Sequence, residues 1–143
     1  MKPVLATLVG AFTCLFTGTI IAIAMQPFIG PLLTPHIRTE AEGLLFPSLL
    51  TGYFVVGAML VAIGVLTEAS EKSWLWIFKM GAALGLAIFL GDHLITAGWS
   101  RLSAIPMAIS GALDALSIVA SFAAVCFVLK RGTLKQDQHF QQQ

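Results

Sequence analysis

The chain has 143 residues, of which 57% are hydrophobic and only 10% are charged, and its net charge is +1. A soluble domain usually carries about 25% charged residues, so the composition indicates a membrane protein. The near-neutral charge provides no basic surface for nucleic acid and excludes a nucleic-acid partner.

Four apolar runs divide the chain, and each is long enough to cross a bilayer, which takes roughly 20 residues in a helix. They predict helices at about 4–26, 44–67, 73–99 and 106–129. Short connections between them favour an up-down order. We therefore expect an all-α, polytopic membrane protein with four transmembrane helices in one domain, residues 1–131, followed by a polar, frayed cytoplasmic tail, residues 132–143.

The first run, Val4 to Met25, has no charged residue. A cleaved signal peptide is an alternative, because Lys2 precedes the run and small residues occur at Ala22 and Ala24. The apolar stretch is longer than the 7–15 residues of a signal core, which favours a retained helix. Residues 27–42 contain three prolines, a glycine and three charges, so we expect a loop there.

The third run begins near Ser73, whose side chain is a good helix cap. Trp74 and Trp76 follow directly, and tryptophan collects at the headgroup level of a membrane. Arginine and lysine determine the orientation: six lie on one side of the predicted bundle and two, Arg38 and Arg101, on the other. The positive-inside rule then predicts that both termini lie in the cytoplasm.

Among the four predicted spans, only the third and the fourth contain an acidic residue, Asp92 and Asp114 respectively. An ionised aspartate at a helix centre costs about 2.5–3.5 kcal/mol on insertion scales, so such residues tend to face the bundle interior. Two readings stay open for Asp114. It is either a structural residue, hydrogen-bonded to its neighbours, or part of a proton, ion or ligand pathway.

Helical spacing places further small and polar residues beside these acids. Ser110, Asp114, Ser117 and Ser121 follow one another at i, i+4, i+7 and i+11, which is one face of a helix. On the third span, Gly85, Asp92 and Thr96 share a face in the same way. Gly81 and Gly85 form a small-xxx-small pair, which predicts a close helix contact.

The two acids lie at similar predicted depths. Asp92 is about 10 Å from the outer end of its span and Asp114 about 13 Å from the outer end of its own, at 1.5 Å per residue. Because consecutive spans pack as antiparallel neighbours, we expect a shared pocket that His93 connects to external water. The predicted polar pocket consists of Asp92, His93, Thr96, Ser110, Asp114 and Ser117.

Known chemical signatures are missing from the sequence: it has no G-x-S-x-G, H-E-x-x-H, phosphate-binding or dinucleotide motif. Cys14 and Cys126 have no metal-binding spacing and differ in depth by roughly 10 Å, so we expect no disulfide between them. A metal site of His36, Asp92 and His93 is disfavoured, because adjacent helical residues point about 100° apart. We predict no catalytic residue, cofactor or metal.

The four-span plan resembles small, uncharacterised four-helix inner-membrane proteins of bacteria, of the domain-of-unknown-function type. The resemblance rests on "LATLVGAFTCLFTG", "FPSLLTGYFVVGAML", "FKMGAALGLAIFLGDHLI" and "ISGALDALSIVASFAAV", and covers residues 3–131. It implies a fold and a location, but no activity.

Three functions remain as hypotheses. The first is a non-enzymatic accessory component that packs in the lipid bilayer as a homo-oligomer or in a larger complex, through its glycine and serine faces. The alternative is a small transporter, channel or proton-coupled module that uses Asp92 and Asp114. The third is a membrane enzyme acting on a lipid or quinone near His93.

Overall fold

The computed structural model describes residues 2–33, 43 and 45–140 of the chain, and they form helices joined by short connections. The helices are α1 (Lys2–Leu33), α2 (Phe46–Leu66), α3 (Trp74–Gly85), η2 (Leu86–Leu90), α4 (Gly91–Trp99) and α5 (Ala104–Phe140). Four candidate spans are long and apolar enough to cross a membrane: Lys2–Pro31, Phe46–Leu66, Trp74–Trp99 and Ala104–Arg131. The predicted all-α fold class with four transmembrane helices is confirmed.

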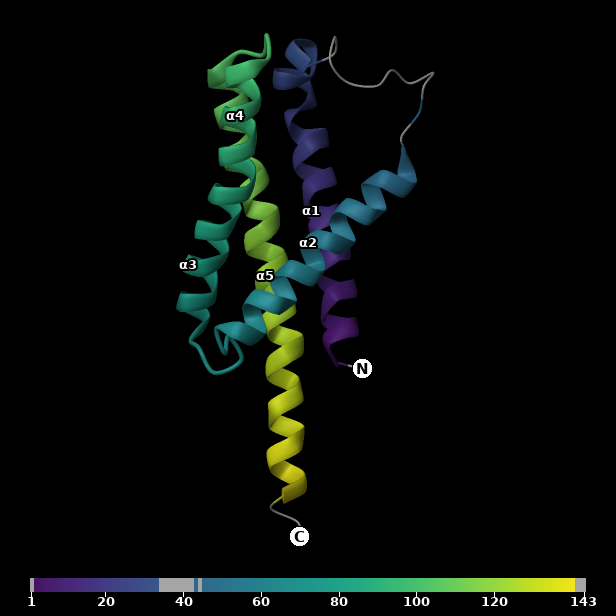
Figure 1. The fold of residues 1–143 in the computed structure, drawn as a ribbon, viewed down its shortest axis with the longest axis vertical. Coiled ribbons are helices and arrows are strands. Elements are labelled where there is room, and N and C mark those ends of the chain that lie inside the picture. The colour runs from purple at the N-terminus through teal and green to yellow at the C-terminus, as the bar shows by residue number, and fades with distance from the viewer. Residues whose placement is uncertain (1, 34–42, 44, 141–143) are drawn as a thin grey trace.

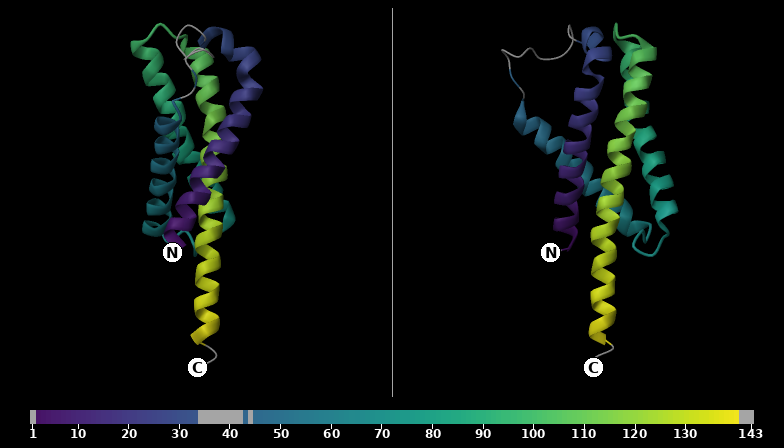
Figure 2. Two further views of the ribbon diagram at one scale, coloured as in Figure 1. Left: turned by 90° about the vertical axis from the view of Figure 1, so that its right-hand side faces the viewer. Right: turned by 180° about the vertical axis from the view of Figure 1, so that it is seen from behind.

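Helix α5 is the centre of the bundle, because α1, α2, α3, η2 and α4 all contact it. Helix α1 lies on one side of α5 and the α3–η2–α4 span on the other, while α2 crosses the bundle obliquely and also packs on α1 (Figures 1 and 2). The start of α1 and the end of α5 lie at one end of the bundle, and the α4–α5 connection lies at the other (Figure 1).

The core lies around α5, where α1, α2 and α3 pack against it. Leu60, Ile77, Ile118, Phe122 and Val125 are fully buried there. Many large apolar side chains point outward instead, among them Phe12, Phe16, Val55, Leu75 and Ile95. Water would disfavour such a surface, whereas lipid tails would cover it.

Glycine brings α3 close to α5. A Cβ at Gly85 would lie 2.5 Å from the carbonyl oxygen of Ala115, and one at Gly81 would lie 3.1 Å from the Cα of Val119. Only a glycine fits at Gly85 without displacing the backbone of α5. At the start of α3, Ser73 is the cap as predicted, because its hydroxyl accepts a hydrogen bond from the backbone N–H of Trp76 at 3.3 Å.

Two expected non-helical segments are helical. Helix α1 continues to Leu33 and contains Pro27 and Pro31, so the predicted loop is wrong for residues 27–33. Prolines are tolerated here because breaking a helix in hydrocarbon would leave many backbone groups without partners. Residues 34–42 lie outside the described part of the chain. Helix α5 likewise continues to Phe140, so the frayed tail is wrong for residues 132–140, which contain no proline and several good helix formers.

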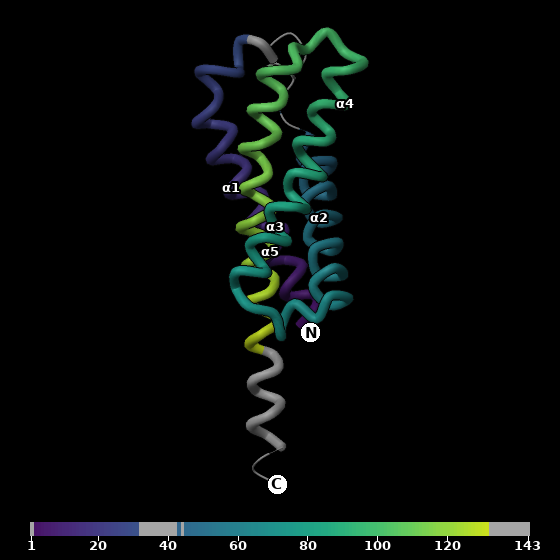
Figure 3. Tube along the Cα trace, turned by 90° about the vertical axis from the view of Figure 1, so that its left-hand side faces the viewer, coloured from purple at the N-terminus to yellow at the C-terminus, as the bar shows by residue number. Residues whose placement is uncertain are grey.

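The third span is interrupted in its middle. Residues Leu86–Leu90 form a π-helical turn, and the backbone N–H of Gly91 donates to the carbonyl of Leu86, five residues earlier. Helices α3 and α4 nevertheless run on as one span alongside α5 (Figure 3). A π turn holds one residue more than the α-helical turn it replaces, so every residue after it is rotated relative to the prediction for a straight helix.

Candidate functional site

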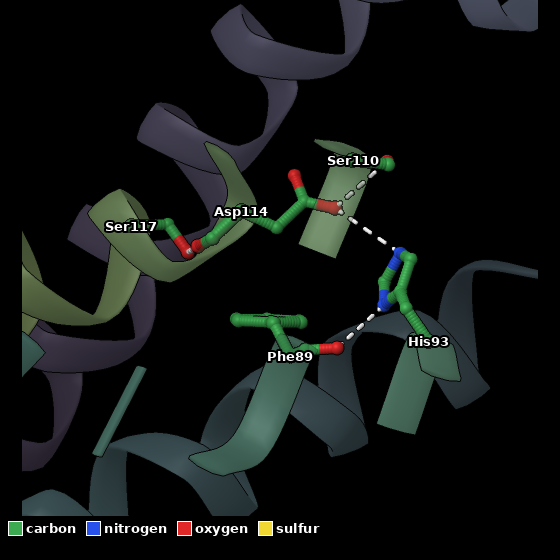
Figure 4. Close-up of polar contacts among 5 residues, drawn as sticks. All are labelled: Phe89, His93, Ser110, Asp114 and Ser117. Atoms are coloured by element: carbon green, nitrogen blue, oxygen red, sulfur yellow. Dashed lines mark hydrogen bonds and ion pairs between the residues drawn. The ribbon is translucent and has the colours of Figure 1, made fainter. Parts of the chain in front are cut away.

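An imidazole and a carboxyl group face each other between α4 and α5. The Nε2 atom of His93 lies 3.5 Å from Oδ2 of Asp114, and both side chains are partly buried (Figure 4). The hydroxyl of Ser110, one turn away on α5, donates to the same carboxyl oxygen at 3.4 Å. His93 and Asp114 thus combine a base and an acid at one point in the membrane-spanning region.

The other ring nitrogen of His93 determines how this pair holds protons. Nδ1 lies 2.8 Å from the backbone carbonyl oxygen of Phe89. A carbonyl only accepts hydrogen bonds, so Nδ1 carries a hydrogen and donates it. Nε2 then either accepts from a protonated Asp114 or, as part of an imidazolium ion, faces its carboxylate. In both states the pair holds one transferable proton and has no net charge.

A cavity of about 330 Å³ adjoins this pair. Helix α4 contributes His93, α5 contributes Ser110 and Asp114, and α1 contributes a largely apolar wall. The residues of that wall are Ile21, Ala22, Met25, Gln26, Ile29 and Gly30. The separation of 3.5 Å is longer than a typical hydrogen bond, and a hydroxyl group in the cavity could hydrogen-bond to either group from its open side.

The structure brings together only part of the predicted pocket. His93, Ser110 and Asp114 meet at the cavity, whereas Asp92 is exposed and, like Thr96, does not line it. Ser117 is fully buried one turn further along α5, where its hydroxyl donates to the backbone carbonyl of Asp114 at 2.6 Å. The predicted set is therefore corrected to His93, Ser110 and Asp114.

The π turn η2 explains why His93, and not Asp92, faces Asp114. At about 100° per residue, a straight helix would place Asp92 on the same side as Gly81 and Gly85. The extra residue of the π turn places His93 on that side instead. Sequence spacing alone missed this, because the prediction assumed an uninterrupted α-helix.

The sequence does not predict the part of the cavity wall that Ile29 and Gly30 of α1 form. The predicted loop at residues 27–42 ends the first span before these two residues. The run of apolar residues from Phe28 to Leu33 around Gly30 and Pro31 was the available signal for a longer helix.

On the far side of Asp114 from the cavity, the interface between α1 and α5 is densely packed. Cys14, Ser117, Ile118 and Ser121 are fully buried there. The thiol of Cys14 donates to the hydroxyl of Ser117 at 3.7 Å, and the hydroxyl of Ser121 donates to the carbonyl of Ser117 at 2.7 Å. These serines satisfy local hydrogen bonds and fill space, so the polar stripe of α5 is a packing face beyond Asp114.

Both cysteines are free and buried in the structure. Within residues 2–33, 43 and 45–131, whose side chains the structure describes, no group of three or more His, Cys, Asp or Glu side chains could hold a metal ion. His36, one of the three residues of the disfavoured metal site, lies outside these residues.

Comparison of the chain with protein-family models, curated proteins and solved structures finds no match. The resemblance to four-helix inner-membrane proteins therefore stays a prediction.

Proposed function

We propose that the chain is a small proton-coupled membrane module, in which the cavity binds a small ligand and the His93–Asp114 pair exchanges one proton. The observation that carries this proposal is the pair itself, an acid and a base 3.5 Å apart beside a cavity of about 330 Å³. Intramembrane ionisable residues that face a bundle interior commonly mark proton or substrate pathways.

The internal packing of the chain favours a proton-coupled module over an accessory component that binds other chains through its glycine and serine faces. Gly81 and Gly85 lie against α5, and Ser117 and Ser121 are buried between helices. The glycine and serine faces proposed for contacts with other chains are thus occupied within this chain. The pair at His93 and Asp114, by contrast, is only partly buried and adjoins open space.

The cavity favours a small, neutral ligand with one hydroxyl group. An apolar cavity of about 150 Å³ holds benzene, and ligand pockets start at about 300 Å³. A ring would pack on Ile21, Met25 and Ile29, and its hydroxyl would hydrogen-bond to the edge of the His93–Asp114 pair that faces the cavity. A neutral ligand matches a pair that has no net charge.

We place this cavity in the outer half of a bacterial inner membrane, with both termini in the cytoplasm. The six-to-two distribution of lysine and arginine supports this orientation. The cavity is lined by the second half of α1, by α4 and by the first part of α5, and these segments lie toward the end of the bundle opposite the start of α1 (Figure 1).

Infrared difference spectroscopy of the chain in lipid nanodiscs tests the proton exchange. A pH step should produce the carbonyl band of a protonated carboxyl group, and Asp114→Asn should remove it. His93→Gln should shift the band in frequency or in its pH of half-change, because Nε2 no longer faces the carboxyl. A band insensitive to both substitutions would overturn the proposal.

Ligand binding is tested with p-cresol as the probe, a ring with one hydroxyl group. It should perturb the Asp114 band in the natural chain but not in Ala22→Phe, because Ala22 lines the cavity. Ala24→Phe is the matched control, since Ala24 is an exposed residue on α1 that does not line the cavity. An equal response in both variants would place the probe elsewhere and contradict the ligand class.

A second candidate function is that of an accessory component that holds a membrane partner, a second copy or a larger complex, in a groove on α2. The oblique course of α2 leaves an open apolar groove of about 530 Å³. Its lining consists of Leu45, Ser48, Leu49, Gly52, Tyr53, Val56 and Phe89.

Gly52→Leu would fill this groove, because nothing lies within 4 Å of a Cβ at Gly52. Gly98→Leu is the control, since Gly98 on α4 is equally open and lies outside the groove. A smaller native mass in mild detergent for Gly52→Leu alone would favour this candidate. An unchanged mass in both variants would contradict it.

A further inference from the structure

The third span contacts α5 both before and after the π turn, and the residues that make these contacts are not spaced as in one continuous α-helix. Gly81 and Gly85 face α5 before the π turn. After the turn, His93 faces it, because a Cβ at Gly111 would lie 3.0 Å from the Cβ of His93. In a continuous α-helix at about 100° per residue, Asp92 would take this position.

The difference of one position equals the extra residue of η2. A π turn closes its hydrogen bonds over five residues instead of four. Each residue after the turn therefore has the angular position that the residue before it would have in a straight α-helix. Position 93 then occupies the angle that position 92 has in a straight helix. The sequence "GDH" therefore contains two candidate partners for Asp114, and the turn selects one of them.

The two partners would produce different chemistry. With His93, the site is an imidazole–carboxyl pair that is neutral when it holds one transferable proton. With Asp92, it would consist of two carboxyl groups, and the same single proton would leave a net negative charge. The first suits a neutral ligand, whereas the second attracts a cation.

The surroundings of the turn allow either register. Helix η2 and α4 contain no buried residue, whereas α3 is held by buried Ile77, Gly81 and Gly85. Phe89 of η2 packs against the core, but no residue of α4 does, so rotating α4 leaves the core residues in place. Gly111 keeps this face of α5 flat beneath Leu90, since a Cβ there would lie 2.8 Å from the Cα of Leu90.

We infer that the extra residue of η2 determines the specificity of the site, because it places His93 rather than Asp92 against Asp114. This inference rests on the proposed function of that pair. It predicts that a chain shortened by one residue in η2 presents Asp92 to Asp114 and acquires an anionic site. Helix η2 acts here as a positioning element, through the residue that it turns toward α5.

Deletion of Ala87 is the direct test, because Ala87 is a small, exposed residue of η2 and its loss removes little packing. Cysteine pairs at 93 and 114 or at 92 and 114, in a chain carrying Cys14→Ser and Cys126→Ala, report the register through a short bifunctional thiol reagent. In the full-length chain only the 93–114 pair should cross-link. In the shortened chain only the 92–114 pair should do so.

Reinsertion of an alanine between Ile88 and Phe89 is the matched control, and it should restore cross-linking of the 93–114 pair. Cross-linking of 93–114 in all three chains would overturn the inference, as would cross-linking of 92–114 in the full-length chain. Cross-linking of the 92–114 pair is measured in the chain without the deletion, so the inference stays testable if the shortened chain does not fold.

The infrared band of Asp114 supplies a readout that a purely structural role would not move. In the chain without the deletion, the Asp114 band should change with His93→Gln and not with Asp92→Asn. In the shortened chain, it should change with Asp92→Asn and not with His93→Gln. The cross-links report geometry without any proton exchange. A failure of the proposed function would therefore abolish the band response and leave the cross-linking pattern intact, whereas a failure of the inference would change the pattern.

Discussion

The Nδ1 atom of His93 lies 2.8 Å from the carbonyl oxygen of Phe89, which is a residue of the π turn. This contact orients the ring so that Nε2 faces Asp114 at 3.5 Å. The turn that rotates His93 toward α5 thus also supplies the acceptor that holds its imidazole.

We expect Nδ1 of His93 to carry a hydrogen in the folded chain, because its partner is a carbonyl oxygen, which cannot donate. Nitrogen-15 NMR of labelled histidine in lipid bilayers distinguishes the two ring nitrogens. Neutral histidine in water prefers the proton on Nε2, so finding it on Nδ1 would be diagnostic. A neutral ring that carries its hydrogen on Nε2 would contradict the hydrogen bond to Phe89.

Substitution of Gly85 should destabilise the bundle. A Cβ would lie 2.5 Å from the carbonyl oxygen of Ala115, so Gly85→Ala forces α3 and α5 apart, and overpacking of this kind costs about 1–3 kcal/mol. Gly98→Ala is the control, because nothing lies within 4 Å of its Cβ. It should be neutral or stabilising by up to about 1 kcal/mol, since alanine favours a helix. Equal unfolding free energies in a mild detergent would contradict this packing.

The side chain of Lys130 should stabilise the connection between α2 and α3. Its ammonium donates to the backbone carbonyls of Ser70 at 3.0 Å and Lys72 at 2.6 Å, and it lies 5.5 Å from the ring of Trp74. Hydrogen bonds from a charged group contribute about 1.5–3 kcal/mol, so Lys130→Gln should lower stability by an amount of this order.

Hydrogen exchange at residues 68–74 measures the effect of Lys130→Gln locally, and faster exchange is expected. Lys79→Gln is the control for removal of one positive charge, because Lys79 is exposed on α3. If the two variants exchange alike, the contacts of Lys130 do not hold this connection.

Thiol reagents should react with neither cysteine in the folded chain. Cys14 and Cys126 are both fully buried and free in the structure, and a thiol must be exposed as thiolate to react. Heating in the presence of a maleimide should label both residues in one cooperative step. Labelling of Cys14 below that step would show that the α1–α5 interface opens locally, and early labelling of Cys126 would show local opening of the core.

The orientation of the chain is tested by reporter fusions after residues 70 and 101. We expect the first to be cytoplasmic and the second to be external, because the side that contains Lys72 has six of the eight basic residues. The opposite pattern would place the cavity in the inner half of the membrane and reverse the predicted orientation.

The sequence by itself determined the number of membrane-spanning segments and their apolar character. Both depend on the length and hydropathy of local segments, such as the uncharged run from Val4 to Met25, and a span is stable in hydrocarbon whatever its neighbours are. Spacing of the same kind also singled out Gly81, Gly85 and Asp114, because small and acidic residues are costly or rare in lipid unless they face another helix.

Only the tertiary structure decided which residue meets Asp114. Asp92 and His93 are adjacent, and a single extra residue in η2 changes which of them faces α5. The α1 wall of the cavity was likewise undecided, since Pro27 and Pro31 predict a break unless the helix continues through hydrocarbon. Helix phase and helix ends depend on contacts between distant segments, such as Gly111 against Leu90, which local spacing does not contain.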